Sequence, residues 1–252
     1  RLVGSEMCIR DSFGRVYNLY FKHNLKKTLK HTDMILYNSE QTKRTTEKYF
    51  PEAKHIKNVN AYIISNPIKK KWVNTDGDYF LYIGNMEKRK GVDLLIKGYL
   101  KYKESGGTKK LILGGKMQEE DINSLVESAM AKDKDISYLD YVSHDKKHEL
   151  YAGMSAFVFP SKAEGFGMPV IEVMRFNKPI IASNLPIFDE ITDGNINTFD
   201  LRCSEQEQIE NLAHIMSDYN ANVDETAYDE VVHRYEPERL GKIVYDFIKT
   251  ED

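Results

Sequence analysis

Short apolar runs alternate with amphipathic stretches along most of the chain. The apolar runs are bounded by glycine, proline or asparagine and predict strands, whereas the longer stretches repeat apolar residues every three or four positions and predict helices. The predicted strands cover residues 34–37, 61–65, 79–83, 109–113, 136–141, 156–159 and 179–182. The predicted helices cover residues 14–30, 39–50, 92–103, 119–131, 146–152, 169–176, 188–191, 204–219 and 237–249. Ser39 can cap the second of these helices.

The regular alternation from residue 79 to residue 192 predicts an α/β fold class. Strands that are apolar throughout are typical of a parallel sheet covered by helices on both faces. We therefore predict a doubly wound, Rossmann-like parallel sheet. Such sheets bind ligands beyond the carboxyl ends of their strands. The candidate functional loops are then 84–91, 114–118, 142–145, 160–168 and 182–187.

Composition and charge narrow the function classes. The 252 residues contain 36 Lys and Arg against 39 Asp and Glu, a net charge of −3, which gives no basic footprint for nucleic acid. No apolar run approaches the ~18–20 residues of a membrane span. Two cysteines, Cys8 and Cys203, make neither a disulfide framework nor a metal cluster and fit a reducing compartment. We expect a cytoplasmic protein without a metal or a nucleic-acid partner.

The first residues differ in character from the rest. Residues 1–12 have no initiator Met, no signal-peptide pattern and no periodicity, so we expect a non-native leader. The alternative is an ordinary disordered N-terminus. Residues 68–78, rich in Lys, Asp and Gly, form the most linker-like stretch.

One loop carries most of the chemical information. Glu164 and Glu172 stand eight positions apart, with two glycines and Pro169 between them. Proline suits the first turn of a helix, and the glycines let the backbone approach a ligand closely. The helix would hold the two carboxylates at separate parts of one elongated ligand. Alternatively, Glu172 only complements the helix dipole and Glu164 is a solvated loop charge.

The stretch from Glu164 to Glu172 resembles the E-x7-E motif of retaining glycosyltransferases of the GT-B fold. Its form, E-G-F-G-x-P-x-x-E, is the one common in family 4, the glycosyl transferases group 1. Four further stretches resemble the C-terminal, donor-binding domain of that family, at residues 82–96, 111–115, 151–161 and 178–184. The resemblance covers about residues 60–250.

The resemblance implies a site for a nucleotide-sugar donor. Glu164 would contact the donor sugar near the reacting centre, and Glu172 would accept hydrogen bonds from the ribose hydroxyls. Lys90 would bind the donor diphosphate, with Arg89 as a weaker neighbouring candidate. Because the nucleoside diphosphate leaves as an anion, a fixed positive charge is what the chemistry needs. The resemblance makes Glu164 and Lys90 the catalytic candidates.

Other residues are implied in donor binding by position. Asn85 stands where many family members carry an Arg; it keeps a hydrogen-bond donor but loses the charge and the bidentate fork. The remaining implied donor-binding residues are Gly84, Gly114, Val142, Phe166, Gly167, Met168 and Pro169.

The implied reaction is metal-independent transfer of a hexose from a nucleotide-diphosphate sugar, UDP- or GDP-linked, with retention of configuration and without a cofactor. The acceptor would be a saccharide or a lipid-linked saccharide. Residues 13–66 would be a remnant of the N-terminal acceptor domain, and residues 67–252 the donor domain. We expect this chain to hold the donor half-site and to be weakly active or inactive. Peripheral association with the cytoplasmic face of a membrane, through the missing N-terminal domain, is a further expectation.

Alternatives stay open at this point. Asn85 favours a non-catalytic nucleotide-sugar-binding module, and a sugar-nucleotide epimerase or a phosphorylase could share the architecture. Asp76-Gly77-Asp78 has the spacing of a D-x-D metal motif, but its polar surroundings before a strand favour a solvated turn. His144 and His148 lie four positions apart without a third ligand nearby. Neither G-x-G-x-x-G after a strand nor a P-loop motif occurs.

Overall fold

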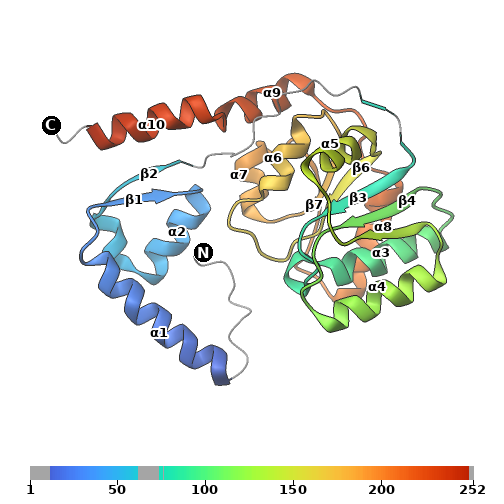
Figure 1. Ribbon diagram of the computed structural model, residues 1–252, viewed down its shortest axis with the longest axis horizontal. Coiled ribbons are helices and arrows are strands. Elements are labelled where there is room, and N and C mark those ends of the chain that lie inside the picture. The colour runs from blue at the N-terminus through green and yellow to red at the C-terminus, as the bar shows by residue number, and fades with distance from the viewer. Residues whose placement is uncertain (1–11, 62–73, 76, 250–252) are drawn as a thin grey trace. The chain divides into compact units, whose positions relative to one another are not determined.

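The computed structural model describes residues 12–61, 74–75 and 77–249. These residues divide into two compact units (Figure 1). The first unit comprises Arg1–Pro67, Ala163–Phe166 and Arg234–Asp252, and the second comprises Ile68–Lys162 and Gly167–His233. The predicted leader, apart from Ser12, lies outside the described residues, and the predicted domain limits at 13–66 and 67–252 stay predictions.

The second unit is built on a parallel sheet. Its strands are β3 (Tyr79–Ile83), β4 (Lys110–Gly114), β5 (Ile136–Leu139), β6 (Ala156–Phe159), β7 (Ile180–Ser183) and β8 (Asn197–Phe199). Their order is β5-β4-β3-β6-β7-β8, and every neighbouring pair is parallel. The chain builds outward from β3 in one direction, then returns to start β6 on the other side. This is the doubly wound topology, so the predicted fold class is confirmed.

Helices cover both faces of this sheet (Figure 1). On one face lie α3 (Val92–Glu104), α4 (Glu120–Lys132) and α8 (Glu205–Ser217), and on the other lie α5 (His144–Gly153), α6 (Met168–Met174) and α7 (Pro186–Thr192). Every residue of β6 and β7 is buried, as expected for strands apolar throughout. Phe159 stacks between Tyr82 and Phe157, with ring centroids 6.2 and 5.6 Å away, so aromatic packing fixes the sheet centre.

The first unit holds a smaller parallel pair of strands. β1 (Met34–Tyr37) pairs with β2 (Lys57–Asn60), connected through α2 (Glu40–Tyr49) and the 3-10 helix η2 (Pro51–His55). The unit also contains α1 (Ser12–Leu29) and α10 (Pro237–Lys249). Leu29, Phe50 and Ala53 form its buried cluster. Ser39 caps α2 as predicted, since its Oγ accepts from the Thr42 N–H at 3.0 Å.

Some elements differ from the prediction. The strand predicted at 61–65 lies outside the described residues apart from Ala61, so it stays a prediction. Strand β2, which pairs with β1, was not predicted. Strand β8 and helix α9 (Glu225–Arg234) were not predicted. In the part of the chain that the structure covers, no helix is both long and apolar enough to cross a bilayer.

Candidate functional site

The strand order reverses between β3 and β6, and the loops that follow these two strands meet at the carboxyl edge of the sheet. The Lys162 N–H donates to the Arg89 carbonyl at 2.9 Å. A Cβ atom on Gly91 would lie 1.9 Å from the Pro160 carbonyl oxygen, and Gly91 has a φ of 71°. Only glycine fits this contact without displacing backbone. The two loops are therefore packed directly against each other.

Lys90 lies in the first of these loops. It ends the short 3-10 helix η3 (Lys88–Lys90), just before Gly91 opens α3. Its Nζ lies 5.6 Å from the centroid of the Phe159 ring, the last residue of β6. A cation is thus placed beside the switch point of the sheet. Arg89 instead pairs with Glu87 at 2.6 Å, and its part in diphosphate binding stays a prediction.

The glycines predicted to bind the donor lie side by side at the carboxyl ends of β3 and β4. The Gly84 N–H donates to the Gly114 carbonyl at 2.9 Å. A Cβ on Gly114 would come within 2.9 Å of Val142 Cγ2, so Val142 belongs to the same edge. The Tyr82 hydroxyl donates to the Asn85 carbonyl at 2.8 Å, and Asn85 is exposed. These predicted residues gather at one edge, although their binding role stays a prediction.

Glu172 lies on α6, and two donors reach its carboxylate from α5. Lys147 Nζ lies 2.8 Å from Glu172 Oε2, and the Tyr151 hydroxyl donates to the same oxygen at 3.2 Å. The side chains of Lys147 and Glu172 are 16% and 19% exposed, so the ion pair is largely shielded. Burial raises the pKa of the Tyr151 hydroxyl well above its usual range, and the charge of Glu172 and the hydrogen bond to it raise it further. Tyr151 therefore stays protonated as a donor.

Glu164 belongs to the first unit, whereas Lys90 and Glu172 belong to the second. The loop that carries Glu164 is held through its neighbours. The Ser39 and Thr42 hydroxyls both donate to the Gly165 carbonyl at 3.2 Å. The ring of Phe166 packs edge-on against Tyr235, with 5.2 Å between centroids. The joint action of Glu164 and Glu172 stays a prediction.

Gly167 turns the chain from this loop into α6. Its φ is 103°, and a Cβ there would lie 2.8 Å from Phe188 Cε1, so a side chain would be both strained and crowded. Met168 is 40% exposed, and Pro169 occupies the first turn of α6 as predicted.

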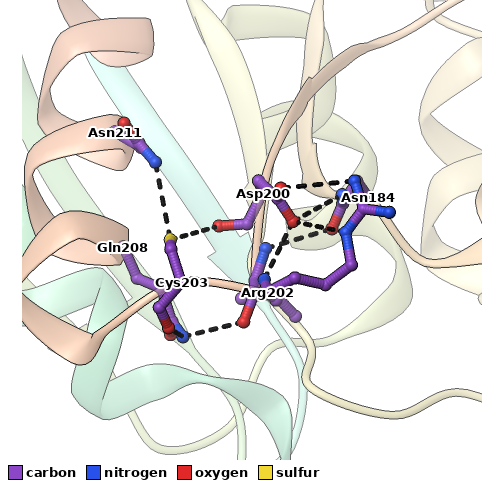
Figure 2. Close-up of polar contacts among 7 residues, drawn as sticks. Asn184, Asp200, Arg202, Cys203, Gln208 and Asn211 are labelled. Atoms are coloured by element: carbon purple, nitrogen blue, oxygen red, sulfur yellow. Dashed lines mark hydrogen bonds and ion pairs between the residues drawn. The ribbon is translucent and has the colours of Figure 1, made fainter.

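The loop that follows β7 is tied to the loop that follows β8 (Figure 2). The Asn184 amide donates to Asp200 Oδ1 at 2.8 Å, and Arg202 Nε donates to the same oxygen at 2.9 Å. The hydrogen bonds from Arg202 lower the pKa of the Asp200 carboxyl, so it stays ionised near neutral pH. These groups satisfy one another and so serve to shape the loop 182–187.

The D-x-D-like stretch at 76–78 and the histidine pair, His144 and His148, were the weaker candidate motifs. Asp78 pairs with exposed Lys110 at 2.9 Å, while Asp76 lies outside the described residues. The His148 ring packs against Phe176, and burial lowers the pKa of its imidazole. Among the residues placed by the structure, no cluster of three or more His, Cys, Asp or Glu side chains could hold a metal ion. The sequence pattern did not assign a site role to Lys147 or Tyr151, because their shared partner, Glu172, lies on another helix.

Known proteins are similar to this chain over the residues that form the parallel sheet of the second unit. The family described as glycosyl transferases group 1 matches residues 65–229. O-antigen chain mannosyltransferase B of Escherichia coli is 37% identical over 128 residues, which is 50% of this chain and 33% of that protein. O-antigen chain mannosyltransferase RfbU of Salmonella typhimurium is 30% identical over 228 residues, 88% of this chain and 63% of that protein. The chain spans less than two thirds of the length of either relative.

Solved structures share the fold at low identity. Sucrose-phosphate synthase from Thermosynechococcus elongatus aligns with a TM-score of 0.75 and 18% identity, over 98% of this chain and 64% of that one. S. aureus TarM, crystallised with UDP among its ligands, aligns with a TM-score of 0.72 and 16% identity, over 95% of this chain and 48% of that one. The expected GT-B type of Rossmann-like architecture is confirmed. With the family match across the whole sheet, these findings show that the chain belongs to the glycosyl transferases group 1 family.

Proposed function

We propose that this chain is the donor-binding part of a glycosyltransferase that uses a nucleotide sugar. The observation that carries the proposal is the placement of Lys90 and Glu172 on the two elements that follow β3 and β6, where the sheet reverses its order. Ligands of doubly wound sheets bind at this place. Membership of the glycosyl transferases group 1 family supports a nucleotide sugar as the ligand.

The two side chains suit the two ends of a nucleoside diphosphate. The Lys90 ammonium would pair with the diphosphate and stabilise the negative charge that develops as it leaves. The Glu172 carboxylate would accept hydrogen bonds from the ribose hydroxyls, a role that needs an acceptor without donors. Glu164 would contact the donor sugar near the anomeric carbon. We further propose that transfer retains configuration and needs no metal ion.

The relatives suggest the sugar and the acceptor. The E. coli and S. typhimurium proteins matched above are named as mannosyltransferases of O-antigen chains. We therefore favour a mannosyl donor, GDP-mannose, and a growing saccharide or lipid-linked saccharide as acceptor. UDP-glucose and UDP-N-acetylglucosamine are the competing donors, since carboxylate and ammonium contacts do not distinguish the bases.

A thermal-shift experiment tests the donor preference. We expect GDP-mannose to raise the Tm of the purified chain, because a ligand at a hundred times its Kd stabilises the folded state by about 2.7 kcal/mol. The two UDP sugars at the same concentration should raise the Tm less. A larger shift with a UDP sugar would overturn the mannosyl assignment. No shift with any donor would oppose the function itself.

A non-catalytic binding module is the second candidate, favoured by the neutral Asn85 at the edge of the diphosphate region. Donor binding alone does not separate it from an enzyme. Slow release of free nucleotide from the bound donor, abolished in Glu164→Gln, would favour the enzyme. A bound donor that stays intact would favour the module.

A further inference from the structure

We propose that Lys147 and Tyr151 are positioning residues for Glu172: they fix one oxygen of its carboxylate and so reserve the other oxygen for the ribose hydroxyls of the donor. This inference rests on the proposed function of Glu172 in nucleotide binding. It adds two residues from a neighbouring helix to the donor site and assigns them the task of reading the sugar of the nucleotide.

Both donors converge on a single atom. Lys147 Nζ and the Tyr151 hydroxyl lie 2.8 and 3.2 Å from Oε2 of Glu172. Within the described parts of the chain, nothing donates to Oε1 of this carboxylate. A carboxylate held at one oxygen cannot rotate freely, so its second oxygen keeps a fixed position for a ligand.

The surroundings make these two contacts strong. Tyr151 is fully buried, and its ring stands edge-on to Phe157 and Phe176, which leaves its hydroxyl little freedom. The Lys147 ammonium lies 5.9 Å from the centroid of the Tyr151 ring, so the same ring also orients the cation. Hydrogen bonds to a charged, shielded group are stronger than hydrogen bonds on the surface.

The pair has a matched internal control one residue away. Lys146 lies next to Lys147 on α5 and pairs with Glu149 at 2.7 Å, with its side chain 47% exposed. Exposed pairs at this spacing contribute little. Lys146→Met removes the same charge from the same helix without touching Glu172.

The experiment measures binding of ribonucleoside and 2′-deoxyribonucleoside diphosphates to the whole chain by calorimetry, using UDP, GDP and their 2′-deoxy forms. The wild-type chain should prefer the ribose form about tenfold, because one hydrogen bond to the charged acceptor is lost in the deoxy form. In Lys147→Met the ribose form should bind about tenfold more weakly, so that the preference disappears. Lys147→Arg should restore part of the preference, and Tyr151→Phe should reduce it. Circular dichroism establishes that each variant is folded.

The possible outcomes distinguish a failure of this inference from a failure of the proposed donor-binding function. A wild-type chain that binds neither nucleotide overturns the proposed function and this inference with it. A wild-type chain that binds but does not distinguish ribose from deoxyribose overturns the inference alone. So does a preference that survives in Lys147→Met, or one that disappears equally in Lys146→Met, since Lys147 would then be a structural ion pair.

Discussion

Replacing Lys90 with alanine should weaken the binding of a nucleoside diphosphate by about 10- to 100-fold, because hydrogen bonds to charged groups contribute roughly 1.5–3 kcal/mol and each 1.4 kcal/mol is a factor of ten. The ammonium stands beside Phe159, where the sheet reverses, and supplies the positive charge of the proposed diphosphate site. Calorimetry with UDP and GDP at low ionic strength measures the effect. Free uridine or guanosine, which lacks phosphates, should bind with unchanged affinity.

Lys88 provides the control for this prediction. It lies on the same 3-10 helix, its side chain is 55% exposed, and its ammonium pairs with Asp121. Lys88→Ala removes the same formal charge two residues away, so it should change affinity only slightly. Equal losses in the two variants would mean that general electrostatic attraction, rather than a specific contact of Lys90, draws the nucleotide.

Replacing Glu172 with alanine should have the largest effect of any single substitution in the site. Nucleoside diphosphate binding should fall by about 100-fold, since the ribose hydroxyls lose a charged acceptor. The variant should also lose about 1–3 kcal/mol of unfolding free energy, because Lys147 and Tyr151 lose their shared acceptor in a shielded position. Calorimetry and urea denaturation measure the two effects.

Two further variants, Glu172→Gln and Glu149→Ala, separate the loss of nucleotide affinity from the loss of stability. The glutamine keeps an acceptor for Tyr151 and should recover much of the stability without the affinity. Glu149→Ala removes an exposed carboxylate from the neighbouring helix and should leave both quantities nearly unchanged. If Glu172→Ala bound nucleotide like the wild type, Glu172 would have no place in the donor site.

The sequence predicted the elements whose pattern is local. The strands at 79–83 and 156–159 have the predicted limits. A run of apolar residues between turn residues identifies such a strand even when the adjacent strands are not known. The same holds for Ser39, whose capping geometry depends on the next three residues. Strand β8 was missed because Asn197, Thr198 and Phe199 make a short and mostly polar run. Its pairing with β7 supplies what its own composition lacks.

The candidate site was predictable in part, because some of its residues lie in local sequence patterns. Lys90, Glu164 and Glu172 lie within short motifs and could be selected from the chain alone. The residues that form hydrogen bonds to these motifs are distant from them in sequence. Lys147 reaches Glu172 across 25 residues, and the hydroxyls that hold the Gly165 carbonyl come from more than 120 residues away. Only the folded chain shows such contacts, because they depend on which helices become neighbours.

Titration of the wild-type chain with UDP and with GDP, in buffer containing EDTA, tests the central claim most directly. The account predicts saturable binding of at least one nucleotide, with the same affinity when excess magnesium replaces the chelator. A folded chain that gives no heat with either nucleotide would contradict a donor site in this part of the protein. Binding that appears only with magnesium would contradict the metal-independent site built around Lys90.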